Sequence, residues 1–259
     1  MAFTILVSGA SATGKTTCFR NLRDQENIIY LNTEVGKELT FPHSFDYYQV
    51  TAVDDVATLI ASAEQFPEVH TIIVDSLTML FDLWIQQRLR TVDMKNRQQM
   101  WGEFAPWVKN LFSGPIKNST KNIILCSHTT HTVNDQKILE VSSIVPGQEM
   151  KKVTLESLFD IVISTKKVPL VDLKKFANPM LTISELEQFL GYKYVFQTRS
   201  TDEDVKEKMR GPHNIWDFKE SFLDNDLQLV LDKLEAHFKG IDGQAKGSTV
   251  RRFGPNKTV

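Results

Sequence analysis

Residues 9–16 form the stretch of this chain whose residue types and spacing point most directly to chemistry. They read GASATGKT and fit the pattern G-x-x-x-x-G-K-[ST] without a mismatch. Gly9 and Gly14 permit backbone angles and a close approach to a ligand that a Cβ would block. Consecutive backbone N–H groups can then point at phosphate oxygens, and the start of a following helix adds a favourable partial charge. The motif predicts a phosphate site, and a chance glycine-rich turn is the alternative.

Each position of this phosphate loop has an expected role. Lys15 would bridge the β- and γ-phosphates, the Thr16 hydroxyl would coordinate Mg²⁺, and Thr17 would lie close to the α-phosphate. ATP and Mg²⁺ are the expected cofactors, although the N-K-x-D motif that reads guanine is absent and the choice of base stays open. The expected nucleotide-binding residues are Gly9, Ala10, Ser11, Ala12, Thr13, Gly14, Lys15, Thr16 and Thr17.

An acidic partner for the metal is expected where a neighbouring strand ends. Asp75 closes the apolar run IIVD and would hold Mg²⁺ through its water shell. The alternative is that Asp75 or Ser76 caps the helix expected to begin at Leu77, and both roles are compatible.

Two further polar residues follow apolar runs and complete a candidate catalytic set with Lys15. Many P-loop ATPases carry a glutamate directly after the metal-linked aspartate, but Ser76 stands there, so Glu34 after NIIYL is the candidate for activating water. His128 after NIILCS could reach the γ-phosphate and report its loss. The alternatives are a solvated loop acid and a histidine satisfied at a sheet edge.

Strands and helices that alternate along the chain must position these residues. Strands are expected at 2–7, 27–31, 47–50, 70–76, 122–127, 160–164 and 192–197, and a hairpin at 130–143. Helices are expected at 15–23, 53–66, 77–89, 98–112, 183–190 and 226–238. This order predicts an α/β fold with a mainly parallel sheet, in one domain over residues 1–239. Residues 240–259 are expected to form a flexible basic tail.

Composition limits the environment and the partners. No apolar run approaches a membrane span and no signal pattern opens the chain, so a cytoplasmic protein without membrane contact is expected. Cys18 and Cys126 have no metal-like spacing, which favours ordinary reduced thiols. A net charge of −2 gives no whole-molecule footprint for nucleic acid, so DNA binding would need a local patch.

Four features stand in order along the chain: GASATGKT, a glutamate after the next strand, IIVDSLT and ILCSH. This arrangement resembles the RecA-like core ATPases. More narrowly, it is similar to phage-encoded nucleotide-binding proteins of the AAA-domain type related to the Sak group of single-strand annealing proteins. The segments VPGQEMKKVTLESLFDIVIS and YVFQTRS also match that group, and the resemblance covers roughly residues 2–200.

The resemblance implies a RecA-like P-loop NTPase core with helices on both faces of the sheet. It assigns Glu34 as the water-activating glutamate, Asp75 as the Mg²⁺-linked acid and His128 as the strand-end sensor. The implied activity is Mg²⁺-dependent ATP hydrolysis in phage recombination or annealing on single-stranded DNA. A homo-oligomer in the host cytoplasm and a single-strand-binding protein as partner are also implied.

Two departures from that family affect the expected assembly. Residues 129–145 occupy the place of a DNA-binding loop but contain only Lys137 as a base. The phosphate loop begins within ten residues of Met1, so an N-terminal oligomerisation strand is not expected. Polymers and strand exchange of the RecA kind therefore do not follow from the resemblance.

Basic residues provide candidates for contacts with a neighbouring subunit or with DNA. A cation supplied across a subunit interface could be Lys166, Lys167 or Arg199, each of which could equally be a solvated charge. Scattered basic spots are Lys151, Lys152, Lys174, Lys175, Lys246, Arg251, Arg252 and Lys257. Phe253 could stack on a base or dock on a protein.

Two other functions remain open. The first is a nucleotide-dependent regulatory P-loop protein that acts on another replication or packaging factor without touching DNA. The second is a small-molecule kinase, which the absence of an evident arginine-rich lid disfavours.

Overall fold

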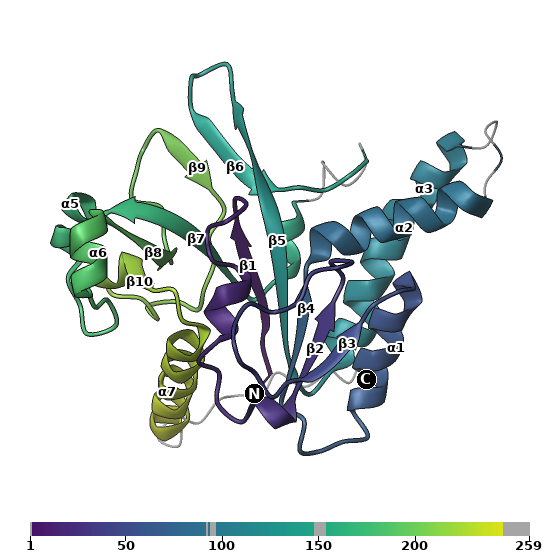
Figure 1. Cartoon of the computed structure of the whole chain (residues 1–259), viewed down its shortest axis with the longest axis horizontal. Coiled ribbons are helices and arrows are strands. Elements are labelled where there is room, and N and C mark those ends of the chain that lie inside the picture. The colour runs from purple at the N-terminus through teal and green to yellow at the C-terminus, as the bar shows by residue number, and fades with distance from the viewer. Residues whose placement is uncertain (1, 92, 94–96, 148–153, 246–259) are drawn as a thin grey trace, which may run out of the picture.

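In the described part of the chain, ten strands and the helices that cover them position the candidate site (Figure 1). The computed structural model describes residues 2–91, 93, 97–147 and 154–245. The strands are β1 (Thr4–Gly9), β2 (Ile28–Asn32), β3 (Asp46–Gln49), β4 (Thr71–Asp75), β5 (Asn122–Val133), β6 (Leu139–Ser143), β7 (Ile161–Pro169), β8 (Tyr192–Gln197), β9 (Val205–Glu207) and β10 (Phe222–Asp224). The α-helices are α1 (Val53–Ala63), α2 (Leu77–Thr91), α3 (Arg97–Leu111), α5 (Leu170–Leu173), α6 (Glu185–Leu190) and α7 (Leu227–Ala245).

The strand order of the main sheet is β10-β8-β7-β1-β5-β4-β2-β3. Neighbours from β7 to β3 are parallel, whereas β8 and β10 are antiparallel to the strands beside them. Strand β5 therefore separates β1, which precedes the phosphate loop, from β4, which ends in Asp75. Because parallel strands end at a common edge, the ends of β1, β4 and β2 lie close together.

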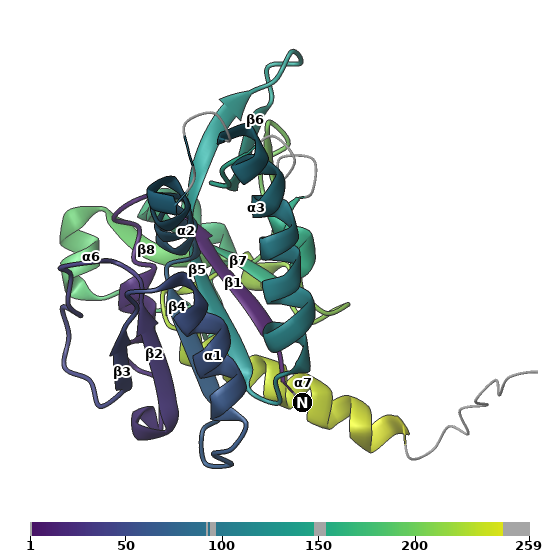
Figure 2. The ribbon, with the colours of Figure 1, turned by 90° about the vertical axis from the view of Figure 1, so that its right-hand side faces the viewer.

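Helices cover both faces of this sheet. On one face, α1, α2 and α3 pack Ile60, Phe81 and Val108 onto strand residues such as Leu125; these helices are in front of the strands in Figure 2. On the other face, α7 packs residues that include Val230. Alternate strand residues point to opposite faces, so strands covered on both sides are apolar throughout. The expected α/β fold, with a mainly parallel sheet and helices on both faces, is confirmed.

The β5–β6 hairpin is also confirmed, and β5 is longer than expected. It leaves the main sheet after its pairing with β1 and continues as a two-stranded extension with β6, reaching Val133. Strand β9 adds to β6 on its other side. The three-residue strands β9 and β10 were not predicted, because so short a segment shows no periodicity.

The helix predicted at 15–23 is wrong in length. Only a single 3-10 turn forms, at Thr16–Phe19, and the amides of Arg20 and Leu22 bond three residues back. The chain then turns at Asp24, whose φ is 51°. At the other end of the chain, helix α7 continues to Ala245 instead of ending at Phe238, so the predicted tail starts within this helix. The rest of that tail, residues 246–259, lies outside the described residues.

The structure also bears on the two cysteines and on membrane-spanning helices. Cys18 and Cys126 are both buried free thiols. Within the described part of the chain, no helix has both the length and the apolar character needed to cross a membrane.

Candidate nucleotide-binding site

The phosphate loop follows β1, and its shape depends on its two glycines. Gly14 has a φ of +97°, which a residue with a side chain would adopt only with strain. A Cβ on Gly9 would lie 2.1 Å from Thr165 Oγ1 on β7 and 2.8 Å from Thr13 Oγ1. Those two threonine hydroxyls are 2.6 Å apart, and Thr13 also donates to the carbonyl of Ala10 (2.8 Å). The loop is therefore closed against β7, and only glycine fits at position 9.

Lys15 is folded inside the loop rather than extended into solvent. Its side-chain ammonium donates to the carbonyls of Gly9 (3.1 Å) and Ala10 (2.7 Å), and the residue is only 6% exposed. Burial lowers the pKa of Lys15, while the nearby carboxylates of Asp75 and Glu34 act in the opposite direction. A buried cation of this kind favours an anion as an additional partner, because its own desolvation is unfavourable.

Asp75, the last residue of β4, contacts Thr16 of the phosphate loop. Its Oδ2 accepts hydrogen bonds from Thr16 Oγ1 (2.6 Å) and from the hydroxyl of Tyr30 (2.7 Å). Burial raises the pKa of Asp75, and these two hydrogen bonds oppose that rise by stabilising the carboxylate. Ser76, by contrast, takes the capping role: its Oγ accepts from the amide of Met79 (3.4 Å).

The residues present fit a magnesium ion shared with phosphates. Thr16 and Asp75 supply a hydroxyl and a carboxylate, and Mg²⁺ prefers oxygen ligands and usually combines one or two carboxylates with phosphates and water. Among the described residues, no group of three or more His, Cys, Asp or Glu side chains could hold a metal alone. Thr16 and Asp75 could therefore hold this ion together with a nucleotide.

Tyr30 is a functional candidate that sequence reasoning missed, and its role can be tested. We expect Tyr30→Phe to raise the free Mg²⁺ concentration needed for half-maximal binding of a nucleoside triphosphate by about fivefold, since one hydrogen bond to Asp75 is worth roughly 1 kcal/mol. A magnesium titration followed by calorimetry measures this. Tyr48→Phe is the matched control, because its hydroxyl contacts only Asp46 on the outer strand β3 among the described residues. An unchanged magnesium requirement in Tyr30→Phe would contradict the role.

Glu34 lies directly beyond β2 and is held at both carboxylate oxygens. Oε2 pairs with the ammonium of Lys37 (2.6 Å), and Oε1 faces Nε2 of His128 at 3.7 Å. Its backbone amide is fixed by the side chain of Asn32 (2.9 Å). The ion pair raises the pKa of Lys37. Glu34 is thus a partly buried carboxylate at the site, not a freely solvated loop acid.

His128 lies beside the phosphate loop but not at a strand end. It is the register partner of Gly9 in the β1–β5 ladder, and β5 continues beyond it because β6 provides a new pairing partner. Burial and the neighbouring Lys15 lower the pKa of His128, while Glu34 acts in the opposite direction, so the net shift favours the neutral imidazole. Its 3.7 Å contact with Glu34 is an ion pair only when the imidazole is protonated. His128 marks the point where β5 leaves the main sheet, so the strand-end placement is corrected.

The structure brings the predicted residues together at one edge of the sheet. Lys15, Asp75, Glu34 and His128 come from four different segments, and their charges act on one another. Thr33 joins two of these segments: its hydroxyl accepts from the amide of Ser76 and donates to the carbonyl of the same residue, both at 2.7 Å. The phosphate-loop motif signalled Lys15, and the apolar runs before them signalled Asp75, Glu34 and His128. Tyr30 reads only as part of a buried strand, and Thr33 as the buried residue that follows it.

The three candidate interface cations have partners within the chain. Lys166 forms an ion pair with Glu207 on β9, and the ammonium of Lys167 lies 3.7 Å from the ring centroid of Tyr192. Arg199 donates from Nη2 to the carbonyl of Trp216 (2.7 Å). Among the predicted basic spots, Lys174 and Lys175 are exposed. The others, Lys151, Lys152, Lys246, Arg251, Arg252 and Lys257, and the tail residue Phe253, lie outside the described residues.

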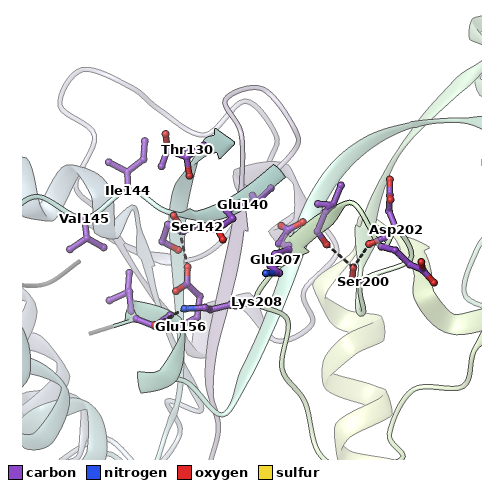
Figure 3. Close-up of a pocket in the computed structure, with 18 residues that line it drawn as sticks. Thr130, Glu140, Ser142, Ile144, Val145, Glu156, Ser200, Asp202, Glu207 and Lys208 are labelled. Carbon is purple, nitrogen blue, oxygen red and sulfur yellow. Dashed lines mark hydrogen bonds between the residues drawn. The ribbon is translucent and has the colours of Figure 1, made fainter. Parts of the chain in front are cut away.

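An acidic hollow of about 1190 Å³ lies beside the β5–β6 hairpin (Figure 3). Glu207 and Asp202 are on its β9 side, and Glu156 lies below β6 with Oε1 accepting from the amide of Ser143 (2.8 Å). Its described lining residues include five acids, namely Glu140, Glu156, Asp202, Glu203 and Glu207, and two bases, Lys206 and Lys208. The described lining residues therefore carry a net negative charge, which disfavours contact with a phosphate backbone.

Comparison with known proteins adds a family assignment. A family model described as an AAA domain matches residues 1–203, which includes the phosphate loop, Asp75, Glu34 and His128. Strands β9 and β10 and helix α7 lie beyond the matched residues. No curated protein showed significant sequence similarity to the chain.

Proposed function

Because the chain belongs to the AAA-domain family, whose members are generally ATPases, we propose that it is a Mg²⁺-dependent ATPase of RecA-like type that acts on single-stranded DNA in phage recombination or annealing. The observation that carries the ATPase part is the convergence of Lys15, the Thr16–Asp75 pair and Glu34 at the ends of β1, β4 and β2.

In the proposed reaction each side chain has a separate task. Bound Mg²⁺ would neutralise charge that develops on the phosphates. Lys15 would offer its ammonium hydrogens to phosphate oxygens, and Thr16 and Asp75 would orient the metal-binding side of the site. Glu34 would accept a proton from the attacking water at Oε1, while the water oxygen bonds to the γ-phosphorus and the bond to the β–γ bridging oxygen breaks. Because Lys37 pairs with Oε2 of Glu34, Oε1 is left facing the site.

The DNA part of the proposal is supported by the sequence resemblance and restricted by surface charge. The acidic hollow argues against a DNA path beside the β5–β6 hairpin. Lys174 and Lys175 are an exposed basic pair directly after α5, and such a pair is suited to contact with a phosphate backbone. We also propose assembly into a homo-oligomer and contact with a single-strand-binding protein, both from the resemblance.

The deciding experiment measures ATP hydrolysis with and without single-stranded DNA. We expect DNA to stimulate the rate severalfold at about 50 mM salt, and the stimulation to fall steeply by about 200 mM, because phosphate contacts depend on counterion release. Lys174→Ala combined with Lys175→Ala should reduce stimulation and leave the DNA-free rate unchanged. A chain that hydrolyses ATP but shows neither stimulation nor a mobility shift would favour the regulatory alternative, in which the partner is another replication or packaging protein.

A further inference from the structure

A polar pocket of about 540 Å³ adjoins the phosphate loop on the side of β8 and β10. Gly14, Thr17 and Asn225 line it next to the loop, and Tyr194 on β8 lines it as well. Thr17 is the residue expected closest to the α-phosphate, so the pocket begins where the phosphate chain of a nucleotide would end.

Asn225 is the unusual residue of this pocket. It is 6% exposed, and its Nδ2 is a buried amide nitrogen without a hydrogen-bond partner among the described residues. The amide lies directly against the phosphate loop: a Cβ on Gly14 would be 3.0 Å from Asn225 Oδ1 and 3.2 Å from Nδ2. A buried donor left unpaired costs free energy, and such groups in native proteins are usually satisfied by water or a ligand.

The surroundings of Asn225 are held rigidly against the loop. Arg20 donates from Nη1 to the carbonyls of Thr17 (2.9 Å) and Asn225 (2.7 Å), which ties these two residues together. On the far side, Asp224 accepts from Thr182 Oγ1 (2.6 Å) and pairs with Lys193 (3.2 Å). The unpaired donor therefore sits in a preformed polar frame, as expected for a residue that contacts a ligand.

We propose that the nucleoside part of the nucleotide occupies this pocket and that Asn225 donates from Nδ2 to it, with Tyr194 as a second contact on its wall. The inference rests on the proposed nucleotide binding and extends it to the half of the ligand that the phosphate loop does not touch. Asn225 lies beyond residue 203, outside the matched AAA domain, so the segment from β10 to α7 supplies this specificity.

The test compares ATP with inorganic tripolyphosphate, which has the phosphates but no nucleoside. Binding of both to the full chain is measured by calorimetry in Mg²⁺. We expect Asn225→Ala to weaken ATP binding about fivefold to tenfold, as for loss of one hydrogen bond, and to leave tripolyphosphate binding within about twofold. Tyr194→Ala should show the same selectivity, and because Tyr194 is 40% exposed its removal does not endanger folding.

A matched control separates ligand contact from a loosened junction. Asn21 donates to Asp226 (2.7 Å) near the start of α7, yet it does not line the pocket, so Asn21→Ala should bind both ligands as the wild type does. Equal losses for ATP and tripolyphosphate, or no loss in either pocket variant, would overturn the proposal. If the wild type bound neither ligand, the phosphate site itself would be refuted together with the pocket.

Discussion

Lys15→Ala is expected to weaken ATP binding by at least about a hundredfold and to abolish measurable hydrolysis. The ammonium lies within the phosphate loop, 6% exposed, where charge-assisted hydrogen bonds to phosphate are worth roughly 1.5–3 kcal/mol each and are poorly screened. Among the described residues, no second lysine donates to the carbonyls of Gly9 and Ala10. Calorimetric titration with ATP and Mg²⁺ measures the loss.

The matched control for this variant is Lys174→Ala, which removes an exposed lysine with no part in the loop. It should bind and hydrolyse ATP as the wild type does in the absence of DNA. Thermal melting of both ligand-free variants establishes that they are folded. ATP hydrolysis at the wild-type rate by Lys15→Ala would contradict the assignment of the phosphate loop.

Glu34→Gln is expected to separate binding from chemistry. The amide has nearly the same shape and keeps an oxygen for Lys37, so ATP affinity should stay within about threefold. It cannot take a proton from water, and loss of a general base lowers rates by about a hundredfold to ten-thousandfold. We therefore expect kcat to fall by at least about a hundredfold, measured as phosphate release at saturating ATP.

Glu38→Gln is the control for this second experiment. Glu38 is an exposed acid in the same loop region, and its replacement should leave kcat unchanged. A Glu34→Gln variant with the wild-type rate would show that another group activates the water. Loss of binding together with rate would instead indicate that Glu34 shapes the site and is not the base.

The sequence alone locates those candidate residues that lie close together in the chain. The phosphate loop is eight consecutive residues, and its glycines, lysine and threonine act through local backbone geometry. Asp75 and Glu34 could be found because each follows a buried apolar run, and parallel strands end at one edge of a sheet. His128 was placed on the correct strand, but its position within β5 depends on a hairpin pairing that residues 122–128 do not reveal.

Pairings between distant segments could not be predicted from local sequence patterns. Tyr30 reads as one more residue of a buried strand, yet its hydroxyl reaches Asp75, 45 residues away. Lys166 was a candidate for contact with a neighbouring subunit, but β9 brings Glu207 to it, and β9 is too short to be recognised from sequence. The chain forms only a 3-10 turn at Thr16–Phe19 and reverses at Asp24, which the spacing of residues 15–23 did not indicate.

The sequence by itself determined the phosphate loop, the alternating α/β order and the acids at the strand ends, because these depend on local backbone conformation and on periodic burial. Only the tertiary structure decided what surrounds them. It placed β5 between β1 and β4, closed the loop against Thr165 and brought Asn225 onto Gly14 from the last part of the chain. Such contacts depend on strand order and on packing between faces, and neither is encoded in the spacing of any single segment.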